Sequence, residues 1–531
     1  MKRILAVCLA LTLLLTGCTG GKLVSGYGKD YVAYENMEYT RPSMSLIEQV
    51  LTNSCNTVRS DTSLDTVLSA IYDYYDAYDR FYTNYNLAYI AYNRDVTDEY
   101  WQAEYEYCAG NSATVDAGLE KLYMALADSP IRSKLESDAY FGLGYFDAYE
   151  DEATWDEGFL ALMEEEYALI SAYYDLSAQA DSAVYYSEEY FDGYADDLCQ
   201  ALIDLVKLRQ QIAAYAGYDS YVQFAYDFYY YRDYTPRQAM DYMEDIRTEM
   251  SDLYQQVNQS DIWSGGYGYC SEDESFSYVQ STAAAMGGVV EEAFGLMERA
   301  GLYDISYSEN KFNTCFEIYL TSYSEPYVFV SPSGYDIDKL SFAHEFGHFV
   351  TDYACGESYA GIDVLEVFSQ GMEYLSLCYD NGEDWLERYK MADCLSTYVE
   401  QAAYACFEQK LYDLTSDELT VENVFALYDQ VCRSYGIDFE ALGWDPRDLV
   451  TVPHYYTDPL YIISYVVSND AAFQLLQLEL DENGAGLAKY EENLTTDCYY
   501  FLEFVEEAGL ESPFALGRVQ RVAQDLEQLL G

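Results

Sequence analysis

Basic residues and histidines are scarce in this 531-residue sequence, which has 27 Lys+Arg against 93 Asp+Glu and only three histidines. The formal charge of −66 repels phosphate backbones and anionic head groups, so we expect no nucleic-acid partner. No CxxC pair occurs among the cysteines, which argues against a cysteine metal site. After the N-terminal apolar run, no segment is long and apolar enough to cross a bilayer.

Aromatic residues are abundant: they make up 17% of the chain, and 62 of them are tyrosines. A chain this rich in aromatic and hydrophobic residues collapses and packs, so the acidity indicates solubility rather than disorder. Many tyrosines recur at helical spacing, such as Tyr72, Tyr75 and Tyr78. At these positions we expect the rings to pack while the hydroxyls reach water.

The N-terminus has the layout of a secretory signal. Met1-Lys2-Arg3 is a basic start, and the apolar run Ile4–Leu15 leads into the ending LTGC. That ending resembles a bacterial lipobox, which predicts a signal peptide over 1–17 and a lipidated Cys18 at the head of a tether over 18–35. An ordinary cleaved signal with an incidental cysteine is the alternative. We therefore expect an extracytoplasmic protein that is lipid-anchored to the bacterial cell membrane, with no other membrane contact.

The rest of the chain reads as mainly α with one small sheet. Apolar residues recur three and four apart over most of 43–214 and again over 236–257. Residues 258–278, rich in Gly, Ser and acid, predict a loop. The only convincing strand pair is 315–320 with 327–330, where aromatic and β-branched residues flank a turn-like TSYSEP.

The motif His344-Glu345-Phe-Gly-His348 has the spacing of a metal site. We expect Asp336 to cap a helix from about residue 337 to 354, with Gly356 just past its end. Two histidines four apart on that helix project from one face and can meet one Zn²⁺. Glu345 then lies beside the metal, where it can take a proton from a zinc-bound water.

A third ligand is expected from the next helix. Asp363 can cap a helix over 364–379, which carries Glu366 in its first turn. Antiparallel packing of the two helices would bring Glu366 over the two histidines. Glu373, two turns further on, could hydrogen-bond a ligand histidine. With three histidines in the chain, a chance HExxH is rare; the alternative is two histidines that are ordinary core residues.

The third histidine, His454, lies shortly before a predicted helix start at Asp458-Pro459. On that helix Tyr461 and Tyr465 would share a face. A phenol aimed at the metal can donate to the oxyanion that forms when water attacks an amide, and His454 can donate to a substrate carbonyl. Among the two phenols, Tyr461 is favoured as core or wall and Tyr465 as the catalytic donor.

Three blocks resemble the thimet-oligopeptidase superfamily, most of all oligoendopeptidase F. They are PYVFVSPSGYDIDKLSFAHEFGH, DVLEVFSQGMEY and VPHYYTDPLYIISY, and LVKLRQQIAAYAGYDSY is similar to the helix that opens the catalytic domain. The resemblance implies a two-lobed helical fold with a deep central channel and a small sheet beside the HExxH helix. It also implies a helical N-terminal lobe over 36–198 and a zinc metallopeptidase domain over 199–531.

The same resemblance implies a monomeric zinc-dependent endopeptidase for short peptides, with one Zn²⁺ per chain held by His344, His348 and Glu366. Glu345, Tyr465 and His454 would act on the substrate. The extended peptide would lie against the strand that includes Tyr327, Val328 and Phe329. Further positions that the resemblance assigns to the site are Glu373, Tyr461 and Gly334.

Two alternatives remain open from the sequence. The first is a related zinc carboxypeptidase or dipeptidase, which the same metal motif would serve. The second is a catalytically inactive peptide-binding lipoprotein.

Overall fold

The computed structural model describes residues 31–137, 140–149, 156–179, 188–260, 262–265, 268–356, 360–380, 384–496 and 498–531. The predicted signal peptide, the lipobox Cys18 and most of the tether lie outside these residues. Within the described part, no helix combines the length and the apolar character that a membrane span requires. The mainly-α class with one small sheet is confirmed.

Helices follow one another along most of the chain. The first six are α2 (Met44–Ser60), α3 (Leu64–Arg94), α4 (Glu99–Ala127), α5 (Arg132–Leu135), α6 (Glu157–Gln179) and α7 (Glu188–Tyr215). The middle of the chain adds α8 (Tyr221–Phe228), α9 (Pro236–Asn258), α10 (Glu272–Met286), α11 (Gly288–Ala300), α12 (Asp338–Cys355), α13 (Ile362–Tyr379) and α14 (Asp384–Ser396). The last are α15 (Ala402–Tyr412), α16 (Val421–Ser434), α17 (Phe439–Leu442), α18 (His454–Thr457), α19 (Ile463–Asp481), α20 (Ala485–Asn493), α21 (Phe501–Glu507) and α22 (Arg518–Leu530).

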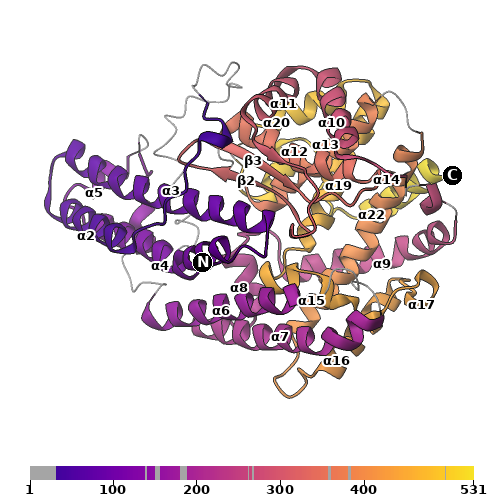
Figure 1. Cartoon of the computed structure of the whole chain (residues 1–531), viewed down its shortest axis with the longest axis horizontal. Coiled ribbons are helices and arrows are strands. Elements are labelled where there is room, and N and C mark those ends of the chain that lie inside the picture. Colours follow the sequence, from indigo (N-terminus) through magenta and orange to yellow (C-terminus); the bar gives the residue numbers. More distant parts are fainter. Residues whose placement is uncertain are drawn as a thin grey trace.

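The N-terminal helices α2, α3 and α4 form a bundle with its own core (Figure 1). Tyrosines fill much of it, and their hydroxyls are satisfied inside the protein: the Tyr75 and Tyr123 hydroxyls lie 2.9 Å apart, and Tyr74 donates to the Val115 carbonyl. The expectation that such hydroxyls reach water is therefore wrong for Tyr75. Tyr72, by contrast, is exposed.

The sheet has three strands in the order β1-β3-β2. β2 (Cys315–Leu320) and β3 (Glu325–Val330) form the predicted antiparallel pair, in the register Phe316 to Phe329. β1 (Tyr303–Asp304) pairs in parallel with β3 and was not predicted. β3 is thus the central strand, and β2 is the outer one in the described part of the chain.

The sheet lies between the N-terminal bundle and the helices that carry the metal motif (Figure 1). On one side α3 packs against β2, where Asn86 donates through Nδ2 to the Tyr319 carbonyl at 2.9 Å. On the other side β3 packs against α12, and α12 packs against α13. The fold therefore places the outer strand between the bundle and the histidine helix.

The predicted loop over 258–278 is shorter than expected. α10 begins at Glu272, because the Ser271 hydroxyl accepts from the Glu274 amide while the Glu274 carboxylate accepts from the Ser271 amide. This reciprocal cap has the local signature Ser-x-x-Glu, so the helix start could have been predicted from the residues alone.

Candidate metal centre and active site

The two motif histidines extend from one face of α12. Their ring centroids are 5.3 Å apart, as expected for residues one turn apart on a helix. The helix ends at Gly356, whose φ of 81° favours glycine. Its start differs from the prediction: Asp336 does not cap it but pairs with Lys339, while Asp338 accepts hydrogen bonds from the Ser333 and Gly334 amides.

Glu366 on α13 meets both histidines. Its Oε2 lies 3.3 Å from His344 Nε2, and its Oε1 lies 3.9 Å from His348 Nε2. One ligand atom from each of the three side chains falls within 4.8 Å of the others, and Glu366 is buried. This is the donor set, two imidazoles and one carboxylate, that catalytic zinc sites use.

Gly347 lets the two helices approach this closely. A Cβ added there would lie 2.7 Å from the Phe368 carbonyl oxygen and 2.7 Å from the Ser369 Cα, both on α13. Any side chain at Gly347 would push α13 away, and Glu366 with it. The glycine inside the motif therefore fixes the separation between the ligand helices.

A shell of hydrogen bonds orients the ligands. Glu373 Oε1 lies 2.8 Å from His344 Nδ1, which leaves Nε2 to face Glu366. Lys390 in turn donates to Glu373 at 2.7 Å. Glu366 accepts from the Ser369 hydroxyl at 2.8 Å and from the Tyr461 hydroxyl.

Glu345 is buried beside the histidines. It lines a cavity of about 240 Å³ together with His344 and with Cys315 of β2. Burial, with the carboxylates of Glu366 and Glu373 nearby, raises the pKa of Glu345 to about 7. A carboxyl group with these surroundings is suited to exchange a proton near neutral pH.

His454, Tyr461 and Tyr465 form a cluster next to the ligands. His454 Nε2 lies 3.1 Å from the Tyr465 hydroxyl, and the His454 and Tyr461 rings stack with centroids 5.0 Å apart. Tyr465 lines a second cavity of about 170 Å³ with His344 and Glu373. The two phenols therefore have different hydrogen-bond partners, because the Tyr461 hydroxyl donates to Glu366 whereas the Tyr465 hydroxyl lies beside His454 Nε2.

The predicted helix start at Asp458-Pro459 is wrong, although the residues it was meant to bring together do meet. α19 begins only at Ile463, because Leu460 has a left-handed φ of 66° and donates its amide to Glu408 at 2.7 Å. Tyr461 lies in this turn, while Tyr465 is on the helix. The expected capping role of Asp363 is wrong too: α13 begins at Ile362, and Asp363 accepts from Arg232 and Tyr234.

The prediction for β3 needs correction. Tyr327, Val328 and Phe329 are buried, and β3 has β2 on one side and β1 on the other at Val328 and Phe329. An extended peptide cannot pair with this strand. Gly334, with a φ of 82°, lies in the turn before α12 and shapes the start of that helix.

Three residues of the site were missed from the sequence: Lys390, Ser369 and Gly347. Lys390 comes from α14, and nothing in the local pattern links a lysine there to Glu373. Ser369 lies three residues after Glu366, so helical spacing could have suggested it.

Comparisons with known proteins bear on the fold of the chain. Residues 34–154 match the peptidase M3 N-terminal domain. A solved structure described as an oligoendopeptidase F has a TM-score of 0.83 at 20% identity, covering 94% of this chain and 98% of its own. A second, from Bacillus anthracis, has a TM-score of 0.80 at 20% identity with the same coverages. PZ peptidase A with an inhibitor has a TM-score of 0.82 at 18% identity, covering 93% and 98%. No curated protein sequence matches the chain.

The chain has the fold of the oligoendopeptidase structures, and its residues 34–154 are similar to the peptidase M3 N-terminal domain. These findings support the thimet-oligopeptidase and oligoendopeptidase F superfamily of metallopeptidases that the three sequence blocks resemble, and they support a peptidase activity. The domain boundary between 198 and 199 stays a prediction.

Proposed function

We propose that this peptidase is a zinc-dependent endopeptidase that cleaves short peptides outside the cytoplasm. The observation that carries the proposal is the convergence of His344, His348 and Glu366, whose ligand atoms lie within 4.8 Å of one another. Two histidines and one carboxylate leave a coordination position for water or substrate, as catalytic zinc sites require.

The donor set fits Zn²⁺. Glu373 binds the Nδ1 side of His344, and Ser369 and Tyr461 bind Glu366, so both ligands are held in place by neighbours. When bound, Zn²⁺ would supply Lewis acidity that polarises the scissile carbonyl and lowers the pKa of water.

The protein's own groups complete the chemistry. Glu345 lines the same cavity as His344, so it can take a proton from the attacking water and later give it to the leaving amine. The Tyr465 hydroxyl, within hydrogen-bond reach of His454, can donate to the oxygen that gains negative charge. His454 positions that hydroxyl and can itself donate to a substrate carbonyl.

The substrate is expected along β2 rather than β3. β2 is the outer strand of the sheet in the described part of the chain, and its Cys315 lines the cavity that holds Glu345. An extended peptide that adds to an outer strand gains backbone hydrogen bonds whatever its side chains, which suits an enzyme for varied short peptides. Location outside the cytoplasm rests on the N-terminal layout alone, with Cys18 as the lipid anchor.

The test compares the soluble body of the protein with Glu345→Gln on a peptide blocked at both ends. We expect internal cleavage that a chelator abolishes and Zn²⁺ restores, and a loss of at least about a hundredfold in kcat for the variant while peptide binding persists. Glu387→Gln, which changes an exposed carboxylate on α14, is the control. Cleavage only of peptides with a free terminus would indicate the carboxypeptidase or dipeptidase alternative. Binding without any cleavage would indicate the inactive peptide-binding lipoprotein.

A further inference from the structure

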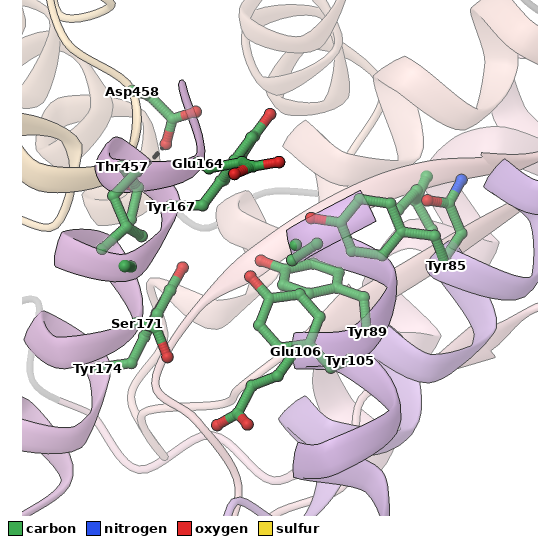
Figure 2. Close-up of a pocket in the computed structure, with 16 residues that line it drawn as sticks. Tyr85, Tyr89, Tyr105, Glu106, Glu164, Tyr167, Ser171, Tyr174, Thr457 and Asp458 are labelled. Carbon is green, nitrogen blue, oxygen red and sulfur yellow. Dashed lines mark hydrogen bonds between the residues drawn. The ribbon is translucent and has the colours of Figure 1, made fainter. Parts of the chain in front are cut away.

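A large cavity lies apart from the metal ligands, between the N-terminal bundle, α6 and β2. It has a volume of about 500 Å³ and is lined by five tyrosines, Tyr85, Tyr89, Tyr105, Tyr167 and Tyr174. Figure 2 shows the rings of Tyr85, Tyr89 and Tyr105 together on one side, and Tyr174 with Ser171 on the other. Neither the metal site nor the catalytic groups account for this wall.

Tyr105 links the two sides of the cavity. Its ring centroid lies 5.8 Å from that of Tyr85 and 5.5 Å from that of Tyr89, both on α3, and 6.4 Å from that of Tyr174 on α6. Burial raises the pKa of Tyr105 to about 12, so the phenol is neutral at physiological pH. The cavity therefore presents several neutral aromatic rings around one space.

The charged groups that line the cavity are acidic. They are Glu106, Glu164 and Asp458, and no Lys, Arg or His is among the described residues that line it. Figure 2 places Glu164 and Asp458 toward one end and Glu106 toward the other. The buried cation Arg209 is held elsewhere, by Glu166 and by the Tyr455 and Tyr456 carbonyls. Asp458 also has partners of its own, since its Oδ2 accepts from the Thr457 hydroxyl at 2.7 Å and lies 3.6 Å from His454 Nδ1. Aromatic faces lined with carboxylates, and with no Lys or Arg in the lining, favour a positively charged guest.

The cavity borders the same strand as the active site, but on its other face. Ile318 of β2 lines it, three residues after Cys315, which lines the cavity of Glu345, and side chains three residues apart point to opposite faces of a strand. At about 3.4 Å per residue, this separation is roughly 10 Å along the strand. Thr457 and Asp458 also line it, shortly after His454 in the chain. A peptide that lies along β2 with its scissile bond at Glu345 would thus place a side chain about three residues away in this cavity.

We propose that this tyrosine-walled cavity is a subsite that binds the cationic side chain, Lys or Arg, of a peptide substrate about three residues from the cleaved bond. The subsite rests on the proposed endopeptidase function, and it gives that function a preference for basic peptides. The preference is local, because it depends on the residues of this cavity and not only on the charge of the whole surface.

The test uses peptides of equal length, blocked at both ends, that carry Lys, Gln or Glu at each position around the cleaved bond. We expect kcat/KM to be about tenfold higher for Lys than for Gln at one position only, and the order to persist at about 1 M salt, where the screening length is about 3 Å. Glu106→Gln combined with Glu164→Gln should lower the Lys-to-Gln ratio, because two of the three carboxylates that line the cavity lose their charge. Glu527→Gln, which changes an exposed carboxylate on α22, should leave the ratio unchanged.

A second variant closes the space instead of removing charge. A Cβ at Gly110, which lines the cavity, meets nothing within 4 Å, so Gly110→Leu can fold and fill it. It should slow cleavage of peptides that reach the cavity and spare shorter ones. The subsite proposal is overturned if the Lys-to-Gln ratio of kcat/KM is the same at every position. It is also overturned if Glu527→Gln lowers this ratio as much as the paired Glu106→Gln and Glu164→Gln changes do. Neither result would contradict the endopeptidase function.

If the protein cleaves no peptide, the proposed endopeptidase function is wrong. The subsite is then tested by peptide binding alone. Fluorescence anisotropy with Glu345→Gln should then show the same Lys-over-Gln preference at one position, reduced by the paired Glu106→Gln and Glu164→Gln changes. Equal affinity for the Lys and Gln peptides would overturn it.

Discussion

His344 Nδ1 and Glu373 Oε1 lie 2.8 Å apart, so the imidazole presents its other nitrogen to Glu366. Glu373 is itself fixed by Lys390, which donates to its second oxygen at 2.7 Å. The orientation of the first histidine of the motif is therefore set by a carboxylate that lies two turns beyond the third ligand on the same helix.

Replacing Glu373 should weaken metal binding without removing a ligand. Glu373→Gln keeps the shape but loses the charge that holds His344 and Lys390, so we expect an about 10- to 100-fold loss of Zn²⁺ affinity. Competition with a chromophoric chelator measures it. Glu387→Gln on the exposed face of α14 should bind Zn²⁺ like the unaltered protein, and equal affinity of both variants would remove Glu373 from the site.

Replacing Tyr461 and replacing Tyr465 should have different effects on zinc affinity and on kcat. Tyr461 donates to Glu366, so Tyr461→Phe should lower Zn²⁺ affinity. Tyr465 contacts His454, and Tyr465→Phe should lower kcat by roughly 10²- to 10³-fold with little change in KM or metal affinity. Steady-state kinetics and zinc titration of both variants test the assignment, which fails if the two give the same pattern.

The buried ion pair between Arg232 and Asp363 should be important for stability. The Arg232 side chain is fully enclosed, with its guanidinium over the rings of Tyr226 and Tyr230 and a hydrogen bond to Ser464 of α19. Asp363→Asn leaves that charge without its counter-ion, at a cost of about 3–5 kcal/mol.

Chemical unfolding of Asp363→Asn measures this cost, and Asp197→Asn, an exposed change on α7, is the control. A variant within about 0.5 kcal/mol of the parent would show that the pair contributes little.

Stability should fall as the pH rises from acid to mildly basic, in part through Glu408. Burial raises the pKa of Glu408 to about 8 from an ordinary value of 4.5, so the folded protein holds this proton more tightly than the unfolded chain. Its contribution is complete below about pH 4.5 and is lost as the pH rises through about 8.

Glu408→Gln should therefore flatten the pH dependence of unfolding over that window, by up to about 1.4 kcal/mol per pH unit. Glutamine can still accept from the Leu460 amide, so the turn before Tyr461 is kept. Half-buried Glu400 and Asp448, whose pKa values are both raised to about 7, add to the same trend, so some slope should remain. Denaturant midpoints at several pH values test this, with exposed Glu422→Gln as the control. The assignment would be contradicted if both variants kept the full slope of the unfolding free energy against pH.

Much of the metal centre could be predicted because its signals are local. His344 and His348 are four residues apart on one helix, so helical periodicity was enough to bring these two together. Glu366 follows in the first turns of the next helix, and expecting antiparallel packing of consecutive helices placed it over the histidines. The class of fold followed from the same periodicity, repeated over most of the chain.

The features that were missed depend on contacts between distant segments. β1 is two residues long and owes its existence to pairing with Val328 and Phe329, so it has no pattern of its own. The late start of α19 depends on Glu408, 52 residues before Leu460. A strong start signal at Asp458-Pro459 was therefore overridden by a tertiary hydrogen bond.

The absence of a side chain at Gly347 has a consequence for how this centre could vary. At Gly347 the main chain of α12 packs directly against the main chain of α13, so the distance between these two helices does not depend on a side-chain rotamer. Substitutions elsewhere in the hydrophobic interior can be absorbed by neighbouring side chains without reaching this contact. The histidines and Glu366 would thus keep their mutual spacing while the surrounding protein drifts in sequence.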